Sequence, residues 1–292
     1  MNWTLEPVLA QILLGLVNGS FYAVLSLGLA VIFGLLSVIN FAHGAFFMVG
    51  AMLAWMGGHY LGLGYWTMLL LAPLAAMAFG MIVERAFLRR LYGIDHLYGL
   101  LMTLGITQVM QGLLRSSYGV SGQPYEVPEA LSGVSDLGFM VVPDYRLWVV
   151  VAALLACLAT RLTIEKTKVG SYLRSGTENR QLVAAFGINV PLMMTITYGA
   201  GVGLAAFAGV LAAPVMRVSP LMGENLIILV FAIVVIGGMG SVAGSVMTAL
   251  ALGVIEAVTK MIYPEASSTV VFLIMILVLL TRPAGLFGRS AA

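Results

Sequence analysis

The chain has 292 residues, of which 61% are hydrophobic and 9% are charged, and its mean hydropathy is +1.05. Soluble domains carry charge on roughly a quarter of their residues, so this composition excludes an ordinary soluble fold. The formal net charge of +2 is too small to indicate a nucleic-acid partner. Long apolar runs instead predict a single all-α domain, 1–292, that crosses a lipid bilayer many times.

Nine apolar windows mark the expected membrane segments, at 8–36, 42–60, 66–83, 97–114, 147–162, 191–213, 225–237, 242–260 and 268–281. The first is longer than a perpendicular crossing requires, because about 20 residues of helix span a bilayer. The seventh is too short to cross alone. The glycines of "GGMGS", 237–241, allow two half-helices to meet inside the membrane. We therefore expect eight or nine crossings, including broken or re-entrant helices.

The charged residues predict the orientation, because loops rich in Lys and Arg stay on the cytoplasmic side. Ten of the 14 basic residues lie in 84–96, 161–190 and the C-terminal tail from 282. The stretch 115–146 holds four acids and two arginines, so we expect it to be the external loop. With nine crossings the N-terminus is outside and the C-terminus inside. The first run lacks the basic residues of a removable leader and is interpreted as a membrane segment.

The polar stretch "KTKVGSYLRSGTENRQLVAAFGINV", 166–190, interrupts this apolar chain. Ser175 and Glu178 have the spacing of a capping box, Gly187 suits the end of a helix, and Pro191 prevents its continuation. These signals predict a helix of about 11 residues over 176–186. Leu182, Val183 and Phe186 would share one side, partly against the membrane domain and partly free for a soluble partner. The alternative is a plain loop that contains one helical turn.

Polar residues inside membrane segments are costly and often mark transport pathways. Asn18 and Ser20 interrupt the first apolar run, and Thr103, Thr107, Gln108 and Gln111 interrupt the fourth. Hydroxyls can instead bond to carbonyls of their own helix, which is the simpler account of Ser20, Thr103 and Thr107. Glu256 lies four residues before Lys260, and a local ion pair is the simpler account of that carboxylate.

Four stretches resemble permeases of the high-affinity branched-chain amino-acid family of ABC importers, the LivH/LivM type, and the LivH type more closely. They are "GLVNGSFYAVLSLGLAVIFGLLSVINFAHGAFFMVGA" (15–51), the polar stretch with Gly170, Arg174, Asn179 and "GI" (187–188), "LVFAIVVIGGMGSVAGSVMTALALGVIE" (229–256) and "RPAGLFG" (282–288). They follow the family's order across most of the chain. The chain departs from the family at Ser175, where Ala is usual, and at Ala45, where Glu is common. No role of that carboxylate is carried over.

The resemblance implies that the segment around 165–190 holds a cytoplasmic coupling helix, which docks on an ATPase subunit. The expected coupling residues are Arg174, Ser175, Glu178, Asn179, Arg180, Leu182, Phe186 and Gly187. The expected translocation path contains Asn18, Ser20, Asn40, His43, Gln108, Gly237, Gly238, Gly240 and Ser241. For His43, a structural role at the "INFAHG" turn is favoured over contact with the solute. "GGMGS" lacks the Lys of a phosphate-binding loop, so it does not indicate a nucleotide site.

We therefore interpret the chain as a non-catalytic permease subunit in a bacterial-type inner membrane. The resemblance implies a homologous second permease in a heterodimer, two ABC ATPases that bind ATP and magnesium, and an extracytoplasmic substrate-binding protein. The chain itself is expected to bind no cofactor or metal. Its cargo would be a branched-chain amino acid or a related amide, urea or aromatic acid. The alternatives are a self-sufficient channel or ion-coupled carrier, for which intramembrane acids are too few, and an intramembrane enzyme, for which His43, His59 and His96 are too scattered.

Overall fold

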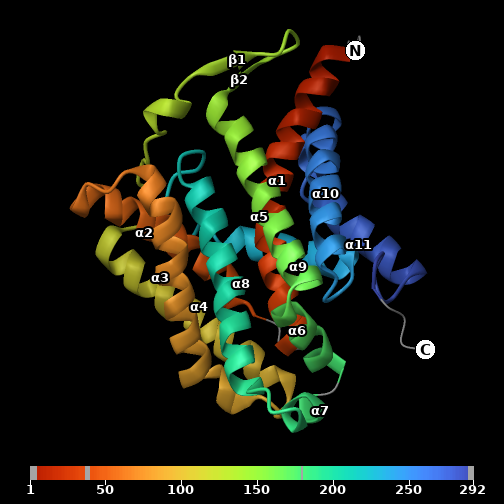
Figure 1. Ribbon diagram of the computed structural model, residues 1–292. Coiled ribbons are helices and arrows are strands. Elements are labelled where there is room, and N and C mark those ends of the chain that lie inside the picture. The colour runs from red at the N-terminus through yellow and green to blue at the C-terminus, as the bar shows by residue number, and fades with distance from the viewer. Residues whose placement is uncertain (1–4, 37–39, 179, 289–292) are drawn as a thin grey trace.

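The computed structural model describes residues 5–36, 40–178 and 180–288, which form a helical bundle (Figure 1). The bundle consists of α1 (Leu5–Leu36), α2 (Ala42–Leu61), α3 (Tyr65–Ala86), α4 (His96–Tyr118), α5 (Asp144–Lys166), α8 (Val190–Ala212), α9 (Glu224–Gly237), α10 (Val242–Ile262) and α11 (Thr269–Thr281). Short elements join these helices: η1 (Leu88–Leu91), η2 (Glu129–Leu131), β1 (Val134–Asp136), β2 (Val141–Pro143), α6 (Lys168–Glu178), α7 (Arg180–Ala185) and η3 (Pro264–Ala266).

Each of the nine expected apolar segments forms a helix, which confirms an all-α membrane protein. Within the described residues, six helices are long and apolar enough to cross a bilayer: α1, α3, α4, α5, α8 and α10. The helices α9 and α11 are apolar but shorter. The first segment is one continuous helix of 32 residues, about 48 Å long, so it must tilt or project beyond the hydrocarbon layer.

The helix α8 lies at the centre because its small residues allow other helices to approach closely. A Cβ atom added at Gly199 would meet side chains of α3, one at Gly201 would meet Ile32 and backbone of α1, and one at Gly209 would meet the backbone of Phe47 in α2. The small-residue stretch at 199–209 is therefore a packing surface.

Two breaks in the helices meet inside the bundle. Gly44, near the start of α2, lies against Gly223, directly before α9, so closely that neither has room for a Cβ atom. The first break is held by Thr103 in α4, whose hydroxyl accepts a hydrogen bond from the Phe41 amide at 3.2 Å. Non-helical backbone needs polar partners or enclosure by protein inside an apolar bundle, and these contacts supply them for Phe41 and Gly223. The break expected at 237–241 is the loop between α9, which ends at Gly237, and α10, which begins at Val242.

The charged loops segregate to opposite ends of the bundle. Glu84, at the end of α3, accepts a hydrogen bond from Thr195 near the start of α8, so the turn after α3 shares one end with α6 and α7. Gln123 pairs with Val218 after α8, which places the loop 119–143 at the other end. That loop carries an antiparallel hairpin of β1 and β2, which the all-α expectation did not include. Figure 1 shows the hairpin beside the N-terminus and α7 at the opposite end.

Candidate coupling and translocation site

The polar stretch folds as two short helices, α6 and α7, and not as the single helix expected over 176–186. Ser175 lies inside α6, so the predicted capping box with Glu178 is wrong. The cap is Thr167, whose hydroxyl accepts a hydrogen bond from the Gly170 amide at 3.2 Å. Glu178 ends α6 and Arg180 begins α7. Asn179 lies outside the described residues.

The segment presents an apolar surface at this end of the bundle. Val183 is buried against the membrane helices, whereas the side chains of Leu182 and Phe186 are 54% and 77% exposed. Gly187 follows with a φ of 81°, and its amide bonds to the Ala184 carbonyl at 2.9 Å, so its predicted role at the end of the helix is confirmed. The expected division of the apolar residues, with Val183 buried and Leu182 and Phe186 exposed, is present.

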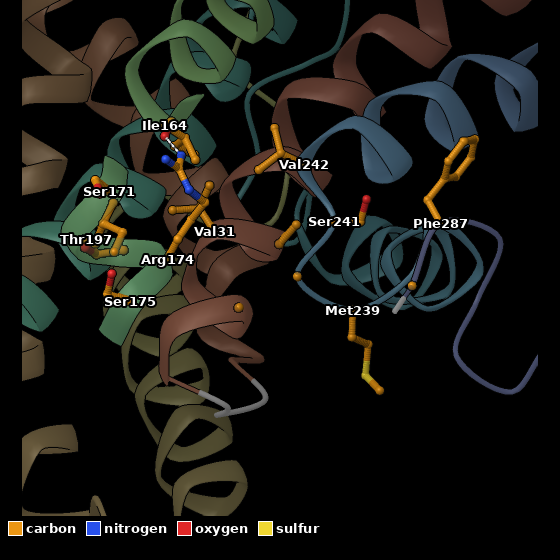
Figure 2. Close-up of a pocket in the computed structure, with 15 residues that line it drawn as sticks. Val31, Ile164, Ser171, Arg174, Ser175, Thr197, Met239, Ser241, Val242 and Phe287 are labelled. Carbon is orange, nitrogen blue, oxygen red and sulfur yellow. Dashed lines mark hydrogen bonds between the residues drawn. The ribbon is translucent and has the colours of Figure 1, made fainter. Parts of the chain in front are cut away.

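Arg174 connects α6 to the preceding membrane helix. Its guanidinium donates a hydrogen bond to the carbonyl oxygen of Ile164, in the last turn of α5 (Figure 2). Terminal carbonyls of a helix lack donors within the helix and carry partial negative charge. A cationic donor at this place supplies the missing hydrogen bond and offsets the charge. Gly170 allows the close approach, because a Cβ atom there would collide with the Ile164 backbone. A movement of α6 would therefore be passed to α5.

A cavity of about 690 Å³ opens between α6 and the loop that joins α9 to α10. Figure 2 shows Arg174, Ser171, Ser175 and Thr197 on one side and Met239, Ser241 and Phe287 on the other. The remaining lining residues are Ala30, Val31, Gly34, Ile164, Leu173, Gly240, Val242 and Gly288. The cavity thus unites the expected coupling residues Arg174 and Ser175 with the expected path residues Gly240 and Ser241.

The loop after α9 is shaped by glycine. Gly238 and Gly240 have φ angles of 100° and 86°, which residues with side chains rarely adopt. Ser241 begins α10 by accepting a hydrogen bond from the Gly244 amide at 3.1 Å. The C-terminal tail closes the other side, since the Leu286 amide donates to the Ile236 carbonyl at 2.8 Å. The motifs "GGMGS" and "RPAGLFG" therefore support each other beside the cavity at α6.

The other expected path residues do not converge. Asn18 is exposed on α1, whereas Ser20 is buried and donates a hydrogen bond to the Leu16 carbonyl of its own helix at 2.7 Å. Gln108 is exposed on α4, which packs on α2 and η1. Thr103 and Thr107 also bond to carbonyls of their own helix, which confirms the simpler account of these hydroxyls.

His43 and Asn40 are enclosed in the centre of the bundle. The Nε2 atom of His43 lies 2.9 Å from the Leu25 carbonyl oxygen, so it carries the proton and donates. This contact ties α2 to α1 and supports the structural role. The other ring nitrogen of His43, the Asn40 amide and the Tyr198 hydroxyl have no hydrogen-bond partner within the described residues. They form a polar group inside the bundle, one turn of α8 away from Thr195.

Glu84 is a buried carboxylate that sequence reasoning counted among loop charges. It is fully buried, and its two oxygens accept hydrogen bonds from Tyr92 at 2.9 Å and Thr195 at 2.6 Å. Thr195 is 111 positions away in the chain, so local sequence holds no signal for this contact. Tyr92, the other donor, lies eight residues after Glu84.

Glu256 is the second carboxylate whose environment differs from expectation. The Tyr22 hydroxyl of α1 donates a hydrogen bond to Glu256 Oε2 at 3.2 Å. Glu256 forms no ion pair with Lys260 among the described residues. The ion pair observed there joins Arg161 and Glu165. The predicted local pair is therefore wrong, because the carboxylate points across to α1.

A second cavity, of about 710 Å³, lies at the hairpin end of the bundle. Its lining includes four aromatic side chains, Trp55, Tyr65, Trp66 and Tyr125, with Glu126 and Glu129. Burial, together with the nearby Tyr65, raises the pKa of the Tyr125 hydroxyl to about 12, so this group stays neutral at physiological pH. The cavity therefore combines aromatic surface with acidic charge.

Comparison with known proteins reveals full-length relatives. The family described as the permease component of branched-chain amino acid transport systems matches residues 11–279. The high-affinity branched-chain amino acid transport system permease protein BraD of Pseudomonas aeruginosa is 31% identical, with 96% of each chain covered. LivH of Escherichia coli, a permease of the same description, is 28% identical over 96% of each chain. Its LivM counterpart is 29% identical over 92% of this chain and 68% of its own. No solved structure matches.

Proposed function

This chain belongs to the family of branched-chain amino acid permease components, and on that premise we propose that it carries branched-chain amino acids inward through a multi-pass permease domain that spans 1–292. The chain is a permease subunit of the ABC importer class and not itself a catalytic enzyme. The observation that carries the proposal is the cavity that joins α6 to the loop of glycines after α9. It separates α6, the neighbour of the short helix α7, from the loop between the membrane helices α9 and α10.

The coupling surface consists of Leu182 and Phe186, with the helices α6 and α7 that present them. Two large apolar side chains more than half exposed at a polar end of the bundle favour docking of another protein. We assign ATP and magnesium binding to two partner ATPases. Force applied to α6 would reach α5 through Arg174 and would reshape the cavity. The expected coupling residues Glu178, Asn179 and Arg180 remain part of this proposal.

The remaining partners follow from the two ends of the bundle. A second, homologous permease is implied by the paired LivH and LivM proteins among the relatives. We place the basic end with α6 and α7 in the cytoplasm, according to the positive-inside rule. The hairpin end then faces outward, where its aromatic and acidic cavity would meet an extracytoplasmic binding protein. The N-terminus would be outside and the C-terminus inside.

The proposal is tested by reconstitution of the complete complex into vesicles. This chain, its partner permease, the two ATPases and the binding protein should together accumulate radiolabelled leucine only when ATP is present on the cytoplasmic side. A complex with an ATPase unable to hydrolyse ATP is the matched control. Equal leucine uptake by vesicles that contain this chain alone, without ATP, would favour a self-sufficient channel or an ion-coupled carrier.

A further inference from the structure

One face of α1 and α10 carries polar groups that the rest of the chain leaves uncovered. From Gly15 to Ala30, every residue of α1 is buried or half-buried except Asn18, which is exposed. Tyr22 follows one helical turn later on the same face and is half-buried. Its hydroxyl binds the half-buried carboxylate of Glu256 on α10 at 3.2 Å. The uncovered strip at the middle of α1 is therefore polar, where a lipid-facing strip would be apolar.

The two helices hold this polar face in a fixed arrangement. Gly15 and Gly19 of α1 lie directly against Gly253 of α10, and a Cβ atom at Gly253 would meet the Gly15 carbonyl oxygen. Such close backbone contact leaves little freedom for one helix to slide on the other. Glu256, Tyr22 and Asn18 consequently keep their relative places.

The face presents acceptors that no ion pair with a described residue satisfies. Glu256 Oε2 accepts a hydrogen bond from the Tyr22 hydroxyl, but a phenol does not neutralise a carboxylate. Lys260, one turn further along α10, acts on Glu256 through its charge but forms no ion pair with it among the described residues. The side-chain amide of Asn18 is exposed. A carboxylate and an amide turned toward hydrocarbon would be costly, so water or a polar group must cover them.

We propose that Asn18, Tyr22 and Glu256 form one wall of the solute route between this chain and a second permease, and that Glu256 receives the ammonium group of the transported amino acid. An ammonium group donates three hydrogen bonds. The Glu256 carboxylate, the lone pairs of the Tyr22 hydroxyl and the Asn18 side-chain oxygen supply acceptors for all three. The inference rests on the proposed function, because it takes an amino acid as the solute.

The first experiment asks whether this face meets water. In a chain whose single cysteine is replaced by Cys157→Ala, the variants Asn18→Cys and Glu256→Cys are assembled into the complete complex in nanodiscs, which expose both ends. A small cationic methanethiosulfonate reagent is applied with and without ATP. The controls Leu70→Cys and Leu277→Cys replace side chains that are 67% and 63% exposed but apolar. Because the reactive thiolate forms in water, residues 18 and 256 should react about tenfold faster than the controls.

The second experiment tests recognition of the ammonium group, with Asn18→Cys as the reporter. Leucine at about ten times its dissociation constant for the proposed route should slow labelling about tenfold. 4-Methylpentanoate, which has the same side chain and carboxylate but no ammonium group, should not slow it. Adding Glu256→Gln should abolish protection by leucine, whereas the control Glu265→Gln, at an exposed acid of η3, should preserve it.

Labelling at 18 and 256 no faster than at the controls, with and without ATP, would overturn the inference. So would labelling that leucine and 4-methylpentanoate slow equally, or that leucine does not slow at all. These results are distinguishable from failure of the proposed function, which is measured separately as ATP-dependent leucine uptake by the unmutated complex. A complex that transports leucine while residues 18 and 256 stay unreactive refutes only the route.

Discussion

At the scale of single residues, Glu84 shows how this chain keeps a carboxylate inside an apolar bundle. Each of its two oxygens accepts one hydrogen bond, one from the Tyr92 hydroxyl and the other from the Thr195 hydroxyl. Thr195 also reaches the Pro191 carbonyl at 3.0 Å, so the contact joins α3 to the first turns of α8. A buried acceptor with two donors in place is a strong local restraint, because removal of the acceptor leaves the donors poorly satisfied.

Glu84→Ala, which removes the whole carboxylate, should therefore weaken the fold more than Glu84→Gln, which removes only its charge. Glu84→Ala removes both acceptor atoms and leaves a void between α3 and α8, so we expect a loss of about 2–4 kcal/mol in the free energy of unfolding. Glu84→Gln keeps the shape and one acceptor and should cost less. Unfolding in a detergent titration of the purified chain measures both. The exposed Glu165→Gln serves as control, and equal stability of Glu84→Ala and the unmutated chain would contradict the argument.

Residue-scale expectations succeeded where the partner lies in the same helix. The hydroxyls of Ser20, Thr103 and Thr107 bond to carbonyls three or four positions earlier, a choice that local geometry determines. Glu256 was wrongly assigned because its partner, Tyr22, is 234 positions distant. Ser175 was wrongly assigned because Thr167 caps the helix eight positions earlier. Pairings between distant helices depend on packing, which no local spacing encodes.

At the scale of elements, α6 and α7 form the part of the chain best suited to transmit force. They are tied to α5 through Arg174 and rest on the bundle through Val183, while Leu182 and Phe186 are exposed. An apolar surface on short helices is stabilised when a partner covers it, since short helices are marginal in water. Docking and the order of this segment are therefore coupled.

Substitutions on this surface should separate docking from folding. Phe186→Asp should strongly reduce copurification of the ATPases, because it places a charge in an apolar contact, while the amount of chain in the membrane stays normal. Glu178→Gln should also weaken the association. Ser175→Ala should have little effect, because Ser175 lies inside α6 and caps nothing. The matched control is Val134→Asp, which alters a side chain that is 66% exposed on the hairpin.

If the Phe186→Asp variant and the Glu178→Gln variant both copurify normal amounts of the ATPases, the partner docks elsewhere. A loss that Val134→Asp reproduces would show that the complex responds to any added surface charge. Copurification is measured from membranes that contain equal amounts of each variant.

Long elements were predictable because about 20 apolar residues leave no soluble alternative. The break at "GGMGS" was predictable for a related reason, since glycines permit positive φ angles that end a helix. The hairpin was missed because its strands have three residues each and depend on contacts such as Ser135 with Asp144 at 2.5 Å. The "DLG" at 136–138, where the Gly138 amide bonds to the Asp136 side chain at 2.8 Å, was the available signal.

At the scale of the whole molecule, the two ends of the bundle differ in charge and in surface. One end holds α6, α7 and the arginines around η1, and the other holds the hairpin with Glu126, Glu129 and Asp136. The fold explains why these loops gather, because the Glu84–Thr195 and Gln123–Val218 contacts assign each loop to its end. Orientation in the membrane is set during insertion by the basic residues, so it remains a prediction from sequence.

Two exposed serines at opposite ends test that orientation directly. Ser132 ends η2 beside the hairpin, and Ser175 lies on α6, so cysteines at these places should leave the helix packing undisturbed. In a chain with Cys157→Ala, Ser132→Cys should react with an impermeant thiol reagent added outside intact cells. Ser175→Cys should react only after permeabilisation, because three arginines in 84–96 and five basic residues in 161–190 hold its end in the cytoplasm. Labelling of both cysteines from the same side would refute the separation of the two ends. Labelling of Ser175→Cys alone from outside would invert the orientation, and the ATPases could then not reach Phe186.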